Sequence, residues 1–218
     1  MTPLQIRATS FAVLLLLSIT GCSSKPNNEQ GSAGSGKTAK APKPAIPTDF
    51  VTGREGFQKL YATARGWAPD AQPVHLESRP RKEDPKNGTA SVWSGNFASP
   101  SMRQIRSFLW SGASAPDAPE PGITPGSPDT YSEGNVSTRP FDLNFLKIDS
   151  DKAFAVATKK KEAATLLKKS PTTPIKYVLY WDPSKARLVW KVIFGGSEYD
   201  AKLIIWVNAS TGEFVRID

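Results

Sequence analysis

Few side chains in this sequence have the chemistry that catalysis or metal binding requires. The 218 residues include one histidine, His75, and one cysteine, Cys22. A catalytic triad needs a base held beside a nucleophile and an orienting acid, and zinc sites need clusters of His, Cys and carboxylate ligands. His75 alternates with Val74 and Leu76, so we expect its side chain to point away from the core. The sequence therefore predicts no catalytic site, no metal site and no cofactor.

One segment matches the glycine-rich pattern that binds nucleotide phosphates. Residues 31–38 read Gly-Ser-Ala-Gly-Ser-Gly-Lys-Thr. The pattern works only between a buried strand and a helix, whose N-terminus and backbone N–H groups then converge on the phosphates. Here Lys-Pro-Asn-Asn-Glu-Gln precedes the segment and Ala-Lys-Ala-Pro-Lys-Pro follows it, and neither run can form such an element. We therefore expect no nucleotide binding at Lys37.

Cys22 lies at the end of an N-terminal secretion signal. Residues 1–7 carry one positive charge, and the apolar run over residues 11–19 is too short to span a membrane comfortably. The sequence Ile19-Thr20-Gly21-Cys22 resembles the bacterial lipobox, in which the cysteine thiol receives a diacylglycerol. The resemblance implies a signal peptide over residues 1–21 and Cys22 as the lipidated N-terminus of a membrane-anchored envelope protein. Ser23 fits delivery to the outer membrane, facing the periplasm, because an Asp at that position favours retention in the enterobacterial inner membrane.

The composition indicates a folded protein with long irregular segments. Hydrophobic residues make up 39% of the chain, which suffices for a core, but 19 are Pro and 16 are Gly. Residues 22–48 contain almost no large apolar side chain and cannot bury enough surface to offset the entropy of ordering, so we expect a disordered tether. The net charge of +8 suits an anionic lipid or wall polymer. We expect no nucleic-acid partner.

The C-terminal part of the chain has the pattern of one helix followed by three strands. Asp149 is the expected N-cap of a helix that ends near Ser170. Its apolar stripe consists of Ala153, Val156, Ala157, Ala164 and Leu167. Alternating apolar residues then predict strands at 175–181 and 188–194, and residues 202–207 predict a third.

The same order occurs earlier in the chain. Thr52 and Glu55 form a capping-box pattern ahead of a helix, and strand-like runs follow at 74–77, 91–97 and 105–110. Three pairs of positions align the halves: Thr52 with Asp149, Trp93 with Trp190, and Trp110 with Trp206. The separations are 149 − 52 = 97, 190 − 93 = 97 and 206 − 110 = 96 residues. This register predicts an internal duplication.

The C-terminal half resembles PepSY domains. The run Ile-Asp-Ser-Asp-Lys-Ala-Phe-Ala-Val-Ala at 148–157 is similar to the start of their helix, and Val-Asn-Ala-Ser-Thr-Gly-Glu-Phe-Val at 207–215 is similar to their closing turn and strand. Asn208 stands where that family usually has Asp, and the first half lacks the Thr-Gly-Glu turn. The resemblance implies an envelope module that inhibits a peptidase or binds a ligand, and names no particular target.

These observations predict an α+β protein with two tandem α-β-β-β units, each a helix packed on an antiparallel three-stranded sheet. The expected boundaries are residues 49–111 for the first PepSY-like unit, 112–140 for a Pro/Gly-rich connection and 141–218 for the second unit. The connection is either a spacer or a ligand-facing flap, and Trp67 either plugs a helix-to-strand junction or is exposed for binding. We expect a non-catalytic role in binding a peptidase or peptide. The alternative is a structural or assembly role at the cell wall through a basic surface. The sequence does not indicate the oligomeric state.

Overall fold

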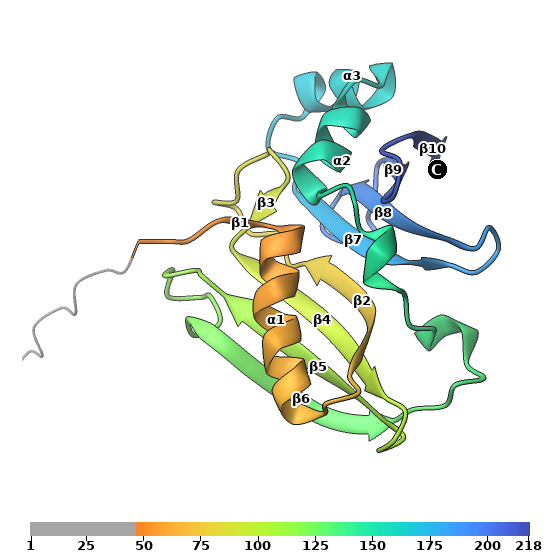
Figure 1. The fold of residues 1–218 in the computed structure, drawn as a ribbon. Helices are drawn as coiled ribbons and strands as arrows, with labels where there is room; N and C mark the ends of the chain where they lie inside the picture. The colour runs from red at the N-terminus through yellow and green to blue at the C-terminus, as the bar shows by residue number, and fades with distance from the viewer. Residues whose placement is uncertain (1–46) are drawn as a thin grey trace, which may run out of the picture. The chain divides into compact units, whose positions relative to one another are not determined.

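The computed structural model describes residues 47–218, which fold as an α+β unit around an antiparallel sheet (Figure 1). Its helices are α1 (Gly53–Trp67), α2 (Ser150–Thr158) and α3 (Lys161–Lys169), with the 3-10 helices η1 (Val136–Thr138) and η2 (Leu143–Phe145). Its strands are β1 (Val51–Thr52), β2 (Gln72–Ser78), β3 (Thr89–Ala90), β4 (Val92–Ser99), β5 (Gln104–Ser111), β6 (Gly122–Thr130), β7 (Ile175–Asp182), β8 (Arg187–Phe194), β9 (Ile204–Asn208) and β10 (Phe214–Ile217). Eight strands form one sheet in the order β10-β9-β8-β7-β2-β4-β5-β6, and β1 pairs with β3.

The expected secretion signal, Cys22 and the glycine-rich segment at Lys37 lie outside the described residues, as does nearly all of the expected tether. Among residues 47–218, no helix has the length and apolarity needed to cross a membrane.

Helix α1 begins where the sequence predicts. The Thr52 hydroxyl accepts a hydrogen bond from the Glu55 N–H at 3.4 Å, and the Glu55 carboxylate accepts one from the Thr52 N–H at 2.9 Å. This capping box satisfies two N–H groups that an isolated helix end would leave without partners. Phe57, Leu60 and Ala64 form the buried face, and the helix packs across β4 and β5 (Figure 1).

The predicted single helix at 149–170 is wrong in its second part. Asp149 caps α2 as expected, but the chain breaks near Lys160 and continues as a separate helix, α3. A straight helix would bring Ala164 onto the stripe of Ala153 and Ala157, because residues seven apart lie almost on the same face. The break turns the chain, so that Ala163 is buried and Ala164 is exposed.

The six predicted strands are present as β2, β4, β5, β7, β8 and β9, and one of the additional strands forms where a connection was expected. Strand β6 lies within residues 112–140 and pairs with β5 at the edge of the sheet. Its sequence contains Pro125 and Pro128, which lack an N–H. An edge strand tolerates such residues because one side of it needs no ladder partner. The prolines and glycines of this segment are therefore the reason why the sequence pattern did not predict the strand.

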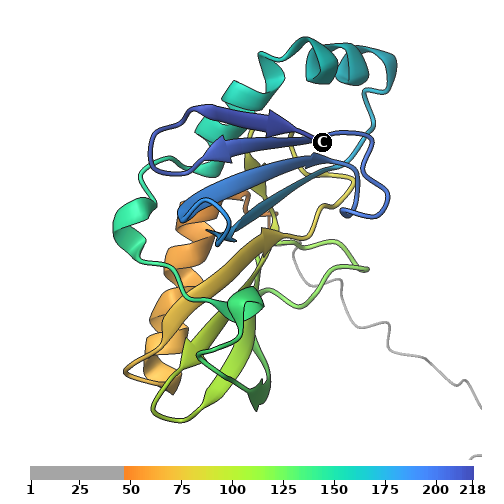
Figure 2. The same ribbon diagram turned by 90° about the vertical axis from the view of Figure 1, so that its right-hand side faces the viewer.

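Within the sheet, the two halves of the chain meet at one strand pair, β2 with β7. Leu76 lies opposite Leu179, and His75 opposite Tyr180. The first half supplies β2, β4, β5 and β6 on one side of this seam, and the second half supplies β7 to β10 on the other. In the turned view of Figure 2, the blue strands of the second half continue the sheet beside β2. Four strands of each half thus share a single sheet, and the expected separate three-stranded sheets are wrong, because β6 and β10 add a strand to each half and β2 pairs with β7.

Two tryptophans lie at the centre of the core. Trp93 on β4 and Trp190 on β8 are both fully buried, and their ring centroids are 6.5 Å apart in an edge-to-face arrangement. Each indole N–H donates to a backbone carbonyl 42 residues earlier: Trp93 to Val51 at 3.1 Å and Trp190 to Ile148 at 2.9 Å. The two side chains therefore have the same kind of partner in each half.

The proposed pairing of Trp110 with Trp206 is wrong. Trp93 lies opposite Trp110 across β4 and β5, whereas Trp190 lies opposite Val207 across β8 and β9. Val207 is therefore the position that matches Trp110, at 207 − 110 = 97 residues. Successive residues of a strand point to opposite faces, so Trp206 lies on the other side of the sheet.

Candidate functional site

A small pocket lies at one end of the seam between the two halves. It has a volume of about 250 Å³ and is lined by residues 80–86, which follow β2, and by residues that precede and begin β7. Four prolines and one aliphatic side chain supply its apolar lining: Pro80, Pro85, Pro171, Pro174 and Ile175. Proline rings are rigid, because their φ is fixed. The pocket walls are consequently preformed to a large extent.

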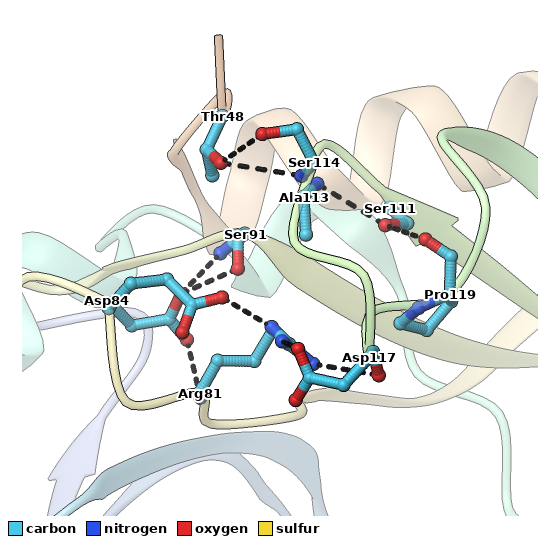
Figure 3. A network of polar contacts seen from close by, with 10 residues as sticks. Thr48, Arg81, Asp84, Ser91, Ser111, Ala113, Ser114, Asp117 and Pro119 are labelled. Carbon is cyan, nitrogen blue, oxygen red and sulfur yellow. Dashed lines mark hydrogen bonds and ion pairs between the residues drawn. The ribbon is translucent and has the colours of Figure 1, made fainter. Parts of the chain in front are cut away.

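A polar network holds the loop that forms one wall (Figure 3). The Asp84 carboxylate accepts hydrogen bonds from the Ser91 hydroxyl at 2.6 Å and from the Arg81 N–H at 2.9 Å. The Arg81 guanidinium donates to Glu83 at 2.6 Å and to Asp117 at 2.7 Å, and these bonds raise the pKa of Arg81. Arg81 thereby ties the loop to residues 111–119.

The same network reaches the first described residues of the chain. Ser111 donates to the Pro119 carbonyl at 2.9 Å, and the Ala113 N–H donates to the Ser111 hydroxyl at 3.2 Å (Figure 3). Thr48 and Ser114 are joined through their hydroxyls at 2.9 Å. Three segments that are distant in sequence thus support the pocket wall through hydrogen bonds.

The pocket has an excess of unpaired positive charge. Lys82 is exposed and Lys86 is half-buried, and neither forms an ion pair within residues 47–218. The Lys86 ammonium donates to the backbone carbonyl of Pro171, and burial lowers the pKa of Lys86. Asp84 already accepts bonds from the loop itself. A negatively charged group entering the pocket would therefore meet two lysines that form no ion pair and one carboxylate, Asp84, that is already hydrogen-bonded within the loop.

A wider depression of about 500 Å³ lies beside the end of α1, but its charges are mixed. Arg65, Asp70 and Asp142 all line it. Asp70 accepts hydrogen bonds from the Ser101 N–H at 2.8 Å and the Ser99 hydroxyl at 2.7 Å, which together lower the pKa of Asp70 to about 2. This carboxylate is used to close the β4–β5 turn.

The face of the sheet opposite α1 and α2, termed the helix-free face, carries an ion pair between β2 and β7. The Glu77 carboxylate on β2 lies 2.7 Å from the Lys176 ammonium on β7 and 3.4 Å from His75 Nε2. Burial by itself would raise the pKa of Glu77. The hydrogen bonds and charges of His75 and Lys176 outweigh burial and lower the pKa to about 2. The pair therefore links the two halves electrostatically.

Farther along this face, cations stack on aromatic rings. The Lys191 ammonium lies 4.6 Å from the Tyr180 ring centre and 4.7 Å from that of Trp206, and the Arg216 guanidinium lies 3.6 Å from Trp206. Lys191 also pairs with Glu198 at 2.8 Å. Burial raises the pKa of Tyr180 to about 12, with a smaller contribution from Asp182. These groups cover one another and leave the rings little free surface.

No known protein family, curated protein or solved structure matches the chain.

The structure separates the residues that the sequence singled out. His75 lies on the helix-free face beside Glu77, away from the helix-covered core as predicted, although it is half-buried. Trp67 is partly buried against Phe108, with ring centroids 6.1 Å apart, at the end of α1. Sequence reasoning missed the pocket altogether. Its only sequence signal is a set of prolines beside lysines in two segments, which nothing in the sequence brings together.

The ion pair across the seam predicts a pH-dependent contribution to stability. The carboxyl of Glu77 titrates near 4.5 when unfolded and near 2 in the fold. The stabilisation is therefore complete above pH 4.5 and is lost as the pH falls towards 2. At about 1.4 kcal/mol per pKa unit, with allowance for the 26% exposure of this side chain, Glu77→Gln should cost about 1–3 kcal/mol at pH 7.

Urea denaturation of the wild type and of Glu77→Gln at pH 7, 5, 4 and 3 would measure this effect. The difference in unfolding free energy should shrink steadily below pH 4.5. A difference that stays constant over the whole series would contradict the assigned role of the carboxylate.

Proposed function

We propose that this protein is a lipid-anchored component of the bacterial envelope that binds a peptide or a peptidase without catalysing a reaction. The observation that carries the binding role is the proline-walled pocket with two unpaired lysines. Ligand sites are concave, mostly apolar and hold a few well-placed polar groups, and this pocket has each of these properties. The resemblance of residues 148–157 and 207–215 to PepSY domains supports the same class of function.

The anchor rests on the sequence Ile19-Thr20-Gly21-Cys22. A diacylglycerol on the Cys22 thiol, with or without a third chain, would hold the protein firmly in the membrane, since each buried methylene contributes about 0.8 kcal/mol. Ser23 favours the outer membrane, with the folded unit facing the periplasm.

We also propose that the two halves are tandem PepSY-like units. Three relations support a constant offset of 97 residues. The helix caps Thr52 and Asp149 have this separation, and so do the two central tryptophans. The carbonyls that accept from those tryptophans, on Val51 and Ile148, repeat it again. The pairing of β2 with β7 would then join equivalent strands of the two units.

The binding role can be tested with a pool of peptides. The purified full-length protein in mild detergent would be incubated with a digest of bacterial envelope proteins, and the retained peptides identified by mass spectrometry. We expect a saturable set of peptides, recovered intact. Cleavage of the retained peptides would refute a non-catalytic role, and a failure to retain any would refute peptide binding.

The membrane anchor predicts a change of cellular fraction. Cys22→Ser removes the only thiol in the chain that could carry the lipid, so the variant should remain unlipidated and move from the membrane fraction to the soluble fraction. Fractionation with immunoblotting and metabolic labelling with a palmitate analogue would measure both effects. Ser23→Ala should leave lipidation unchanged. A Cys22→Ser protein that still carries label and stays with membranes would exclude the proposed anchor.

A second candidate function is a structural or assembly role at the cell wall. It is favoured by the exposed lysines of the α2–α3 region, which are Lys152, Lys159, Lys161, Lys168 and Lys169. Contacts between exposed charges weaken strongly with salt, whereas burial in a pocket does not. Retention on isolated wall material that disappears between 50 and 500 mM salt would support this second role.

A further inference from the structure

The walls of the pocket at the seam fit a small apolar group. Four prolines and Ile175 line it, and its volume is about 250 Å³. Pockets for drug-sized ligands usually span about 300–1,000 Å³. The space is therefore suited to one side chain, and it is too small for the paired acyl chains of a phospholipid.

The lysines that line the pocket favour the binding of an anion. Lys86 is half-buried, its ammonium donates to the backbone carbonyl of Pro171, and the exposed Lys82 also lines the pocket. The two carboxylates nearest in sequence are occupied: Asp84 accepts from Ser91, and Glu83 accepts from Arg81. A buried cation is stabilised most by a carboxylate or phosphate within hydrogen-bond distance. The negative charge of an anion bound here would also offset the effect of the burial that lowers the pKa of Lys86.

One common chemical group places an apolar side chain directly beside a negative charge. The C-terminal residue of a peptide carries its side chain and its carboxylate on the same carbon atom. Recognition of a peptide through its terminal carboxylate is a recurring mode of binding. An internal residue has no carboxylate of its own backbone to offer the lysines, because both of its backbone ends are amides.

We propose that the pocket between residues 80–86 and 171–175 binds the C-terminal residue of a peptide whose last side chain is aliphatic, with its carboxylate on Lys86. This proposal rests on the peptide-binding function above and specifies its ligand. The proline walls and Ile175 hold the side chain, and Lys82 adds a second positive charge to the lining. The Arg81–Asp117 and Asp84–Ser91 contacts keep the loop in place (Figure 3).

Isothermal titration of the full-length protein in mild detergent would test the ligand class. The probes are Ala-Ala-Leu with a free carboxylate, the same tripeptide as its C-terminal amide, and isovalerate as a free acid of the same chemistry. We expect one binding site for the free tripeptide. A charge-assisted hydrogen bond contributes about 1.5–3 kcal/mol, so the amide should bind at least about tenfold more weakly. Equal affinity for the acid and the amide would overturn the proposal. Tighter binding of isovalerate than of the tripeptide would show that the ligand is a free carboxylic acid and not the C-terminus of a peptide.

Matched lysine variants distinguish binding at the pocket from a general effect of positive charge on affinity. Lys86→Gln should weaken the free tripeptide about tenfold or more, and Lys86→Arg should restore most of the affinity. Lys185→Gln removes an equal charge from the exposed β7–β8 turn and should have no effect. Unchanged affinity in a folded Lys86→Gln protein would exclude this site. If the peptides retained from an envelope digest shared no aliphatic C-terminus, the ligand assignment would fail while the binding function remained.

Discussion

Trp93→Ala and Trp190→Ala should each lower the free energy of unfolding by about 3–5 kcal/mol, which is the usual cost of truncating a buried Trp. Both side chains are completely buried, and each donates its indole N–H to a backbone carbonyl. Truncation therefore leaves both a cavity and a carbonyl without its partner. Since small domains are stable by only about 5–15 kcal/mol, either variant should lose a large share of its stability. Chemical denaturation monitored by circular dichroism would measure the loss.

The two tryptophans should also be coupled. Edge-to-face aromatic pairs contribute about 0.5–1.5 kcal/mol beyond their buried area, so the double variant should lose less than the sum of the single losses. Tyr199→Ala, at a fully exposed aromatic, is the control and should change stability by no more than about 0.5 kcal/mol. A mild Trp93→Ala beside a severe Trp190→Ala would contradict the equivalence of the two positions and, with it, the proposed duplication.

Local signals in the sequence predicted the elements that depend on local physics. The helix caps at Thr52 and Asp149 need only neighbouring backbone groups, and both are confirmed. The strands with alternating apolar residues, such as β7 and β8, are confirmed because one face of each packs on the helices. In these segments the periodicity records which face meets the helices.

The sequence pattern did not predict the features that depend on tertiary contacts. Strand β6 carries few apolar residues because it lies at an edge, where pairing with β5 and not burial keeps it in place. The break between α2 and α3 buries Ala163 and exposes Ala164, and the sequence pattern alone does not distinguish these two neighbouring alanines. The wrong match of Trp110 with Trp206 has a similar origin, since residue type alone does not show on which face of a sheet a tryptophan lies.

The candidate site was less predictable than the fold. The pocket combines residues 80–86 with 171–175, which are adjacent only because β2 pairs with β7. No spacing within either segment encodes that contact. Both segments contain proline, but the sheet order determines where the pocket residues meet.

A second large effect is expected at Gly88, which lies beneath the first turn of α2. Its φ is +94°, and a Cβ at this position would lie 2.2 Å from Asp151 Cα and 2.8 Å from the carbonyl carbon of Ser150. Both contacts are with backbone, which cannot rotate away. Its neighbours also depend on its position, because the Gly88 N–H donates to the Tyr177 hydroxyl at 3.0 Å and its carbonyl accepts from Ser150 at 2.6 Å.

The Ser150 hydroxyl connects this contact to α1. It accepts the Gly53 N–H at 2.7 Å while donating to Gly88, so one buried chain of hydrogen bonds joins the starts of α1 and α2 to the loop after β2. A displaced Gly88 would therefore leave buried groups without partners, each at a cost of about 1–3 kcal/mol. The loop that lines the pocket ends at this point, so its position depends on the same bonds.

Gly88→Ala should consequently lower the free energy of unfolding by about 2–4 kcal/mol, from overpacking and from the unfavourable backbone conformation. Gly66→Ala provides a matched control, because a Cβ there meets nothing within 4 Å and the residue lies in α1. Alanine is the better helix former, so this control should be neutral or stabilising by up to about 1 kcal/mol. Urea denaturation of both variants would compare them directly. Equal stability of Gly88→Ala and Gly66→Ala would mean that α2 does not rest on Gly88, and the arrangement of the loop beside it would have to be revised.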